Sequence, residues 1–134
     1  MAALKAEVLP IRNEMDMVQV RHAVRAGAAE LAFSLVDQTK IVTAASELAR
    51  NTLQHGGGGT VRLEFVNDGV KRGLRLEFED KGPGIPDISL ALRDGYTTGG
   101  GLGMGLPGTR RLVNEFNIAS RPGEGTTVTI IKWK

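Results

Sequence analysis

Three polar residues recur at intervals of four near the middle of this 134-residue chain: Glu47, Asn51 and His55. Residues four apart lie on one face of an α-helix, so a helix here would place them in a single stripe. The amide oxygen of Asn suits Mg²⁺, which takes few protein ligands and leaves the other positions to waters and substrate phosphates. A carboxylate one turn away can accept the proton of a nucleophile. An ordinary solvated helix face is the alternative, and the stripe alone does not decide between them.

Two further segments place polar groups at the ends of predicted strands. Asp80 ends an alternating segment and is followed by Gly82 and Gly84. A carboxylate there can accept a hydrogen bond from an exocyclic amine such as that of adenine, and glycines let the backbone approach a ring closely. Thr126 and Thr127 begin the last predicted strand, where only one of two adjacent side chains can face a pocket. The alternatives are a charged turn residue at position 80 and plain β-propensity at the threonines.

A glycine-rich segment separates these groups, because residues 82–108 hold nine of the 18 glycines. Its GMGLPG matches the dinucleotide-binding pattern formally, but that pattern must open a parallel βαβ unit, and the strands that follow look like a hairpin. The Gly-Lys-Ser/Thr of a Walker loop is missing. A segment of this length with few packing residues is typical of a functional loop. Simple flexibility is the alternative.

The elements that must position these residues follow from hydrophobic periodicity. We expect Asp37 to cap the second helix, Pro10 to mark an edge strand, and Pro107 to lie in the first turn of the third main helix. The order β-α-α-β-β-loop-α-β-β predicts an α+β fold, a two-layer sandwich with a mixed sheet and helices on one face, as one domain over 1–134. Strands are expected at 6–13, 60–66, 72–80, 117–122 and 125–134, helices at 15–33, 38–55 and 107–116, and a short helix at 86–94.

Composition bounds the class of protein. Hydrophobic residues make up 41% and charged residues 24%, as in an ordinary soluble globular domain. The lack of cysteine excludes disulfides and thiolate metal sites. A net charge of +2 with scattered basic residues and 4% aromatics argues against a nucleic-acid partner. No apolar run is long enough for a membrane span and no secretory signal is evident, so a cytoplasmic protein without a membrane partner is expected.

Taken together, the segments ELARN (47–51), DKGPGI (80–85), GGGLGMGL (99–106) and GTT (125–127) resemble, in this order, the Bergerat-fold or GHKL superfamily of ATPases and kinases. That superfamily includes gyrase, Hsp90, histidine kinases and MutL. The resemblance implies ATP and Mg²⁺ as cofactors, Glu47 as catalytic base, Asn51 as the Mg²⁺ ligand and Asp80 as the adenine reader. The implied nucleotide-binding residues are Asn51, Asp80, Gly82, Gly84, Ile85, Thr98, Gly99, Gly100, Gly101, Leu102, Gly103, Met104, Gly105, Leu106 and Thr126, with residues 99–106 forming an ATP lid.

Within that superfamily, the lid start at 95–98 and its exit at 106–108 look closer to RsbT-type switch kinases than to the RsbW and SpoIIAB anti-sigma factors. His55 departs from this pattern, since anti-sigma relatives often carry a histidine there. Because nothing is predicted outside the ATP domain, no separate phospho-accepting histidine domain is expected. Arg50, about 100° around the helix from Asn51, would serve a partner contact or a salt bridge.

The implied function is that of a protein serine/threonine kinase of a bacterial partner-switching module. Its substrate would be a STAS-domain antagonist or scaffold in a stressosome-like complex, and the released kinase would activate a metal-dependent protein phosphatase. Two alternatives stay open: an anti-sigma-type regulator that sequesters a sigma factor, and an ATPase fragment of a larger machine.

Overall fold

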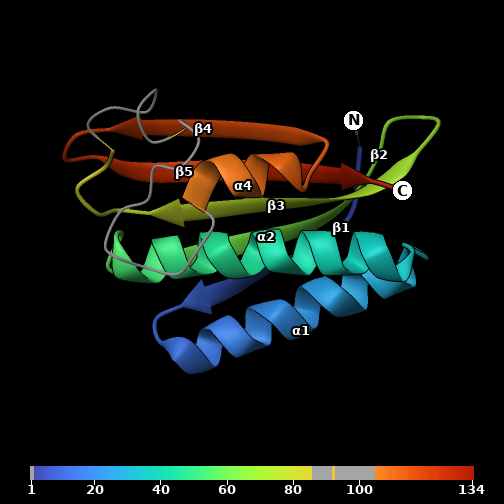
Figure 1. Cartoon of the computed structure of the whole chain (residues 1–134), viewed down its shortest axis with the longest axis horizontal. Coiled ribbons are helices and arrows are strands. Elements are labelled where there is room, and N and C mark those ends of the chain that lie inside the picture. Colours follow the sequence, from blue (N-terminus) through green and yellow to red (C-terminus); the bar gives the residue numbers. More distant parts are fainter. Residues whose placement is uncertain (1, 86–91, 93–104) are drawn as a thin grey trace.

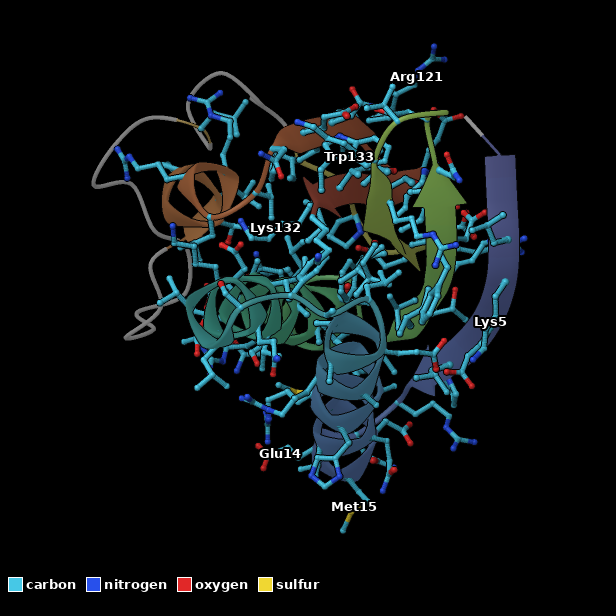
Figure 2. The ribbon with its side chains drawn as sticks, turned by 90° about the vertical axis from the view of Figure 1, so that its right-hand side faces the viewer. Lys5, Glu14, Met15, Arg121, Lys132 and Trp133 are labelled. Atoms are coloured by element: carbon cyan, nitrogen blue, oxygen red, sulfur yellow. The ribbon has the colours of Figure 1, made fainter. Side chains whose placement is uncertain are left out.

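The computed structural model describes residues 2–85, 92 and 105–134. It has two layers, a five-stranded sheet and helices on one of its faces (Figure 1). Figure 2, turned by 90°, shows the described helices on the same side of the sheet. The α+β class, the element order and the two layers are confirmed. The elements are β1 Ala2–Ile11, α1 Glu14–Glu30, α2 Leu35–Gln54, β2 Gly59–Asn67, β3 Arg72–Asp80, α4 Gly105–Arg111, β4 Glu115–Arg121 and β5 Gly125–Trp133.

The sheet has the strand order β1-β2-β3-β5-β4, and each neighbouring pair is antiparallel. The expectation of a mixed sheet is therefore wrong for the described strands. A single crossover helix would return the chain for a parallel strand, whereas α1 and α2 form a pair that brings the chain back to the end it left. Ile11 at the end of β1 accordingly lies opposite Gly59 at the start of β2. Further along the chain, β5 lies between β3 and β4 and is antiparallel to both.

One row of residues crosses all five strands at the same end of the sheet. Ile11 pairs with Gly59, Gly59 with Asp80, Asp80 with Thr126, and Thr126 with Ser120. This row faces the helices, because a Cβ added at Gly59 would lie 2.9 Å from Cγ2 of Thr52 on α2. The fold thus places two predicted site residues, Asp80 and Thr126, side by side beneath α2.

The apolar core fills the space between the sheet and the two long helices. Alternate residues of the central strands, such as Val61, Leu76 and Ile130, are fully or almost fully buried, and they meet Ile41 and Leu48 of α2. Burial of this kind, at about 25 cal/mol per Å² of apolar surface, is the main force that fixes α2 on the sheet. The rigid core therefore sets the position of the polar residues that α2 carries.

Helix α2 begins earlier than periodicity indicates. Ser34 is its N-cap, since the Ser34 hydroxyl oxygen accepts a hydrogen bond from the Asp37 backbone N–H at 3.1 Å. The expectation that Asp37 is the cap is therefore wrong. Asp37 lies in the first turn, where its negative charge interacts favourably with the helix dipole and stabilises the helix. The helix starts earlier than predicted because Ser is as good a capping residue as Asp. Leu35 and Val36, although exposed, do not oppose helix formation.

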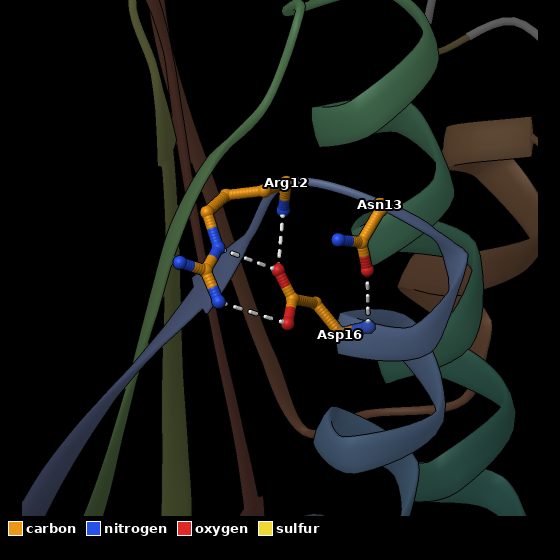
Figure 3. Close-up of polar contacts among 3 residues, drawn as sticks. All are labelled: Arg12, Asn13 and Asp16. Carbon is orange, nitrogen blue, oxygen red and sulfur yellow. Dashed lines mark hydrogen bonds and ion pairs between the residues drawn. The ribbon is translucent and has the colours of Figure 1, made fainter.

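Helix α1 starts with a capping arrangement that also holds the end of β1 (Figure 3). The side-chain oxygen of Asn13 accepts from the Asp16 N–H at 2.9 Å. Asp16 in turn accepts from the backbone N–H and the Nε of Arg12, both at 2.9 Å. Pro10 lies two residues earlier in β1, which is an edge strand as expected.

The third described helix is shorter than predicted. Helix α4 ends at Arg111 rather than 116, and Glu115 already pairs with Ile131 in the sheet. The chain here pairs with β5 instead of continuing the helix that its periodicity predicts. The Asn114 side-chain oxygen supports this pairing, since it accepts a hydrogen bond from the Trp133 N–H at 2.8 Å. Pro107 lies in the first turn of α4, as expected. The short helix predicted at 86–94 falls outside the described residues except for Leu92.

Candidate functional site

Glu47 and Asn51 lie one turn apart on α2, as their spacing predicts. Glu47 is only 8% exposed, and its Oε2 accepts a hydrogen bond from Nη1 of Arg50 at 3.0 Å. The salt bridge, one of the two roles expected for Arg50, is therefore present. Asn51 is half-buried, and its side chain makes no hydrogen bond to another residue of the described part of the chain. Its amide oxygen is thus available for a ligand.

Asp80 ends β3 and lies against the C-terminal end of α2. Its Oδ1 accepts from the Gly82 N–H at 2.9 Å. A Cβ added at Gly56 would lie 2.3 Å from the Asp80 Cγ, so glycine is required there for the carboxylate to occupy its place. The backbone N–H of Gly56 donates to the Asn51 carbonyl at 3.2 Å, which joins this glycine to the helix that carries Glu47 and Asn51. The structure therefore places Asp80 beside the C-terminal end of the helix that carries Glu47 and Asn51.

Gly56 opens a run of glycines after α2, and the sequence motifs did not mark it as a site residue. The signal that it does more was available, because helix termination needs one glycine in the left-handed region. The run has four, Gly56 to Gly59. Gly57 and Gly58 have positive φ values of 73° and 104°, whereas Gly56 makes a close approach to a neighbouring element.

The loop after β3 is packed against backbone on both sides. A Cβ at Gly82 would lie 2.7 Å from the Gly56 Cα, and one at Gly84, where φ is +80°, would lie 2.2 Å from the carbonyl oxygen of Arg121. A Cβ added at Gly125, where φ is also positive, would likewise lie 2.2 Å from the Asp80 carbonyl oxygen. Contacts within the protein therefore already require glycine at positions 82 and 84, and these contacts fix the path of the loop beside Asp80.

Thr126 and Ile85 meet through a residue that sequence reasoning missed, Ser120 on β4. The Ser120 Oγ accepts from the Ile85 N–H at 2.7 Å and donates to the Gly125 carbonyl at 3.0 Å. It also lies 2.8 Å from Oγ1 of Thr126. Of the two adjacent threonines, Thr126 shares the face of Asp80, as expected for the pocket residue. Ser120 belongs to a strand that was correctly expected, but no sequence pattern marked its side chain.

The remaining predicted residues divide between the described and undescribed parts of the chain. Thr98, Gly99, Gly100, Gly101, Leu102, Gly103 and Met104 lie outside the described residues. Gly105, with a φ of +69°, and the buried Leu106 open α4.

Lys132, which was not predicted, fixes the segment after α4. Its Nζ donates to the Leu112 carbonyl at 3.2 Å and lies 3.6 Å from Oδ1 of Asp37.

Two classes of feature are not found in the residues for which coordinates are described. Among the described residues, no three His, Asp or Glu side chains gather where they could hold a metal ion. No described helix has the length and apolar character needed to cross a membrane.

Comparison with known proteins gives a consistent picture. Residues 36–134 match the model of the histidine kinase-, DNA gyrase B- and HSP90-like ATPase family. The chain is 50% identical over 123 residues to the serine/threonine-protein kinase RsbT of Bacillus subtilis, covering 92% of each chain. It is 34% identical to the anti-sigma F factor of Anoxybacillus flavithermus, covering 84% of this chain and 80% of that one.

A solved structure agrees in fold. The crystal structure of the RsbU and RsbW domains of a Mycobacterium tuberculosis protein superposes with a TM-score of 0.66 and 24% identity, over 97% of this chain and 33% of that one. The 50% identity to a serine/threonine-protein kinase along nearly the whole chain confirms the expected enzyme class and the use of ATP. The chain therefore belongs to the histidine kinase-, DNA gyrase B- and HSP90-like ATPase family.

Proposed function

We propose that this protein transfers the γ-phosphoryl group of ATP to a serine or threonine of a STAS-domain antagonist in a bacterial partner-switching pathway. The observation that carries the proposal is the close approach between Asp80 and the end of α2, the helix that bears Glu47 and Asn51, in a chain half-identical to a serine/threonine-protein kinase. Phosphoryl transfer requires mainly positioning and neutralisation of charge. A rigid helix packed on the end of a sheet can hold side chains in fixed positions for both tasks.

In this proposal Asp80 and Thr126 receive the adenine base, with Gly82, Gly84 and Ile85 beside it. Residues 99–106 are the proposed ATP lid, and Thr98 is a further proposed nucleotide-binding residue. Asn51 is the protein ligand of Mg²⁺. Its fit rests on the donor chemistry: a half-buried amide whose oxygen is not engaged by the described residues, one turn from a carboxylate. When bound, Mg²⁺ supplies charge neutralisation at the phosphates, and it tolerates a single protein ligand because waters and phosphates fill the other positions.

Glu47 is the proposed general base, which accepts the proton of the attacking hydroxyl. Its burial keeps water away, and the contact with Arg50 holds one carboxylate oxygen in a fixed direction, so that the other oxygen is the one presented to the substrate. Arg50 is itself 40% exposed in its side chain. It acts in this scheme as a positioning residue rather than as a group that touches the phosphates.

The partners are proposed from the resemblance to switch kinases. The acceptor is a STAS-domain antagonist or scaffold, the kinase works in the cytoplasm, and after release it activates a metal-dependent protein phosphatase. The 34% identity to an anti-sigma F factor supports one rival, a regulator whose output is the sequestration of a sigma factor.

Incubation of the protein with γ-labelled ATP, Mg²⁺ and candidate STAS partners tests the proposal. We expect label on a serine or threonine of one partner, and we expect no label when Mg²⁺ is chelated. A stable complex with a sigma factor, formed without any transfer of label to a STAS protein, would contradict the proposal and favour the anti-sigma rival.

A further inference from the structure

We infer that Ser120 determines the base preference of the nucleotide site. It accepts the only hydrogen of the Thr126 hydroxyl, so that Thr126 can act only as a hydrogen-bond acceptor toward the base. This inference rests on the proposed ATP site at Asp80 and Thr126. A serine hydroxyl has one hydrogen to donate and two lone pairs that accept. Ser120 has three partners within 3.0 Å: the Ile85 N–H, the Gly125 carbonyl and the Thr126 hydroxyl.

The direction of each bond follows from the chemistry of the partners. The Ile85 N–H can only donate, so Ser120 accepts from it. The Gly125 carbonyl can only accept, so it takes the single hydrogen of Ser120. The 2.8 Å contact with Thr126 then has one solution, in which the Thr126 hydroxyl donates to the remaining lone pair of Ser120. Ser120 is thereby fully used.

The consequence concerns the other side of Thr126. Its only hydroxyl hydrogen is donated to Ser120, so Oγ1 of the partly exposed Thr126 offers lone pairs alone to a ligand. The neighbouring Asp80 is its directly paired residue across β3 and β5, and an ionised carboxylate also offers only acceptors. Directly opposite residues on one face have Cβ atoms about 5 Å apart, so both groups can reach one edge of a base.

Two adjacent acceptors select the functional group at position 6 of a purine. Adenine carries an amino group there, which donates. Hypoxanthine and guanine carry a keto oxygen, which accepts and would meet two further acceptors without a hydrogen between them. Freed from Ser120, the Thr126 hydroxyl can turn its hydrogen toward a keto oxygen. Ser120 is therefore a positioning residue for specificity, although it need not touch the base.

The test compares ATP with inosine triphosphate, which has a keto oxygen in place of the 6-amino group. Equilibrium dissociation constants are measured by calorimetry for the full chain, without a protein partner. We expect the wild type to prefer ATP by at least about 100-fold, as a site built around a donor on the ligand does. Ser120→Ala is expected to lower this ratio about five- to tenfold, which corresponds to one neutral hydrogen bond.

Two controls separate base selection from a general loss of structure. Thr127→Val removes a hydroxyl from the opposite face of the same strand, and it should leave the ratio unchanged. In a Thr126→Val background, Ser120→Ala should no longer change the ratio, because the hydroxyl that it releases is gone. If Ser120→Ala does not fold, Ser120→Cys, which keeps the shape but bonds weakly, should lower the ratio as well.

An unchanged ratio in Ser120→Ala, or an equal fall in the Thr126→Val background, would overturn the inference, since a merely structural serine weakens both nucleotides alike. Failure of the proposed function looks different. A protein that binds ATP with the expected base preference but labels no partner would contradict the kinase proposal and leave the role of Ser120 standing.

Discussion

At the scale of single residues, the close approach between Gly56 and Asp80 gives the sharpest steric prediction. A methyl group at position 56 would lie 2.3 Å from the Asp80 Cγ, so Gly56→Ala must displace the carboxylate or the end of α2. We expect ATP affinity to fall more than tenfold, with a loss in unfolding free energy of about 1–3 kcal/mol, as for other overpacked sites. Calorimetry with ATP and urea unfolding measure the two effects.

The adjacent Gly57 provides the matched control. It has a positive φ of 73° but no atom within 4 Å of an added Cβ. Gly57→Ala should therefore cost about 1 kcal/mol of stability through backbone strain, without an effect on ATP affinity. Equal losses of affinity in both variants would show that the Asp80 contact is not what matters.

Asn51 gives the prediction for the metal. Its amide is the one proposed protein ligand of Mg²⁺, so Asn51→Ala should abolish the gain in ATP affinity that Mg²⁺ provides, while metal-free binding changes little. Titrations with ATP in the presence of Mg²⁺ and of a chelator measure this gain. Asn117→Ala, at an exposed position on β4, should keep it. A Mg²⁺-dependent gain that survives in Asn51→Ala would assign the metal to other ligands.

At the scale of elements, the start of α1 predicts a dependence of stability on pH. The hydrogen bond from the Arg12 side chain, together with the bond from the Arg12 backbone N–H, holds the pKa of Asp16 below its ordinary value. Because the folded pKa is the lower one, this contribution is present above the unfolded pKa of about 3.9. It is lost as the pH falls through the folded pKa.

Asp16→Asn should therefore lower the unfolding free energy at pH 7, and the difference from wild type should shrink steadily below about pH 4. Urea unfolding at a series of pH values measures it. Glu14→Gln, an exposed acid in the same first turn, serves as control and should show a much smaller effect. A difference that is the same at pH 7 and at pH 3 would mean that the ion pair with Arg12 is not its source.

The element boundaries show what periodicity can and cannot predict. The β2–β3 hairpin was predicted nearly residue for residue, because its alternation of apolar and polar side chains is regular. Residues 112–116 were assigned to a helix, but the helix ends at Arg111, and Glu115 and Phe116 pair with β5, a contact that leaves no mark on the local sequence pattern. The early start of α2 reflects a choice between two good capping residues, Ser34 and Asp37, which local sequence alone does not rank.

At the scale of the whole molecule, the sequence was sufficient for the class and the layers but not for strand direction. A mixed sheet was predicted, yet the paired α1 and α2 return the chain so that β2 runs antiparallel to β1. The candidate site, too, was predicted only in part. Glu47, Asn51, Asp80 and Thr126 are marked by motif and spacing, whereas Gly56 and Ser120 act through contacts between distant segments, which only the folded chain reveals.

The prediction of one domain over 1–134 can be checked with the single tryptophan. Trp133 lies at the end of β5, and its Nε1 donates to Oε2 of Glu115 at 2.6 Å, so its fluorescence reports on the closing hairpin of the sheet. Far-UV circular dichroism reports on the helices. The two urea transitions should coincide, as in a two-state domain. Separate midpoints would show that the β4–β5 hairpin unfolds independently of the helical layer.

The central claim is that Glu47 takes part in chemistry and not in nucleotide binding. The most direct measurement is single-turnover transfer of labelled phosphate to the STAS partner, made together with the ATP dissociation constant, in wild type and Glu47→Gln. We predict that transfer slows about 10²- to 10⁴-fold, as expected for loss of a general base, while the dissociation constant stays within about threefold, too small a change in binding free energy to account for the slower transfer. Glu30→Gln, an exposed carboxylate on α1, should match wild type in both. Transfer at the wild-type rate in Glu47→Gln would contradict the account.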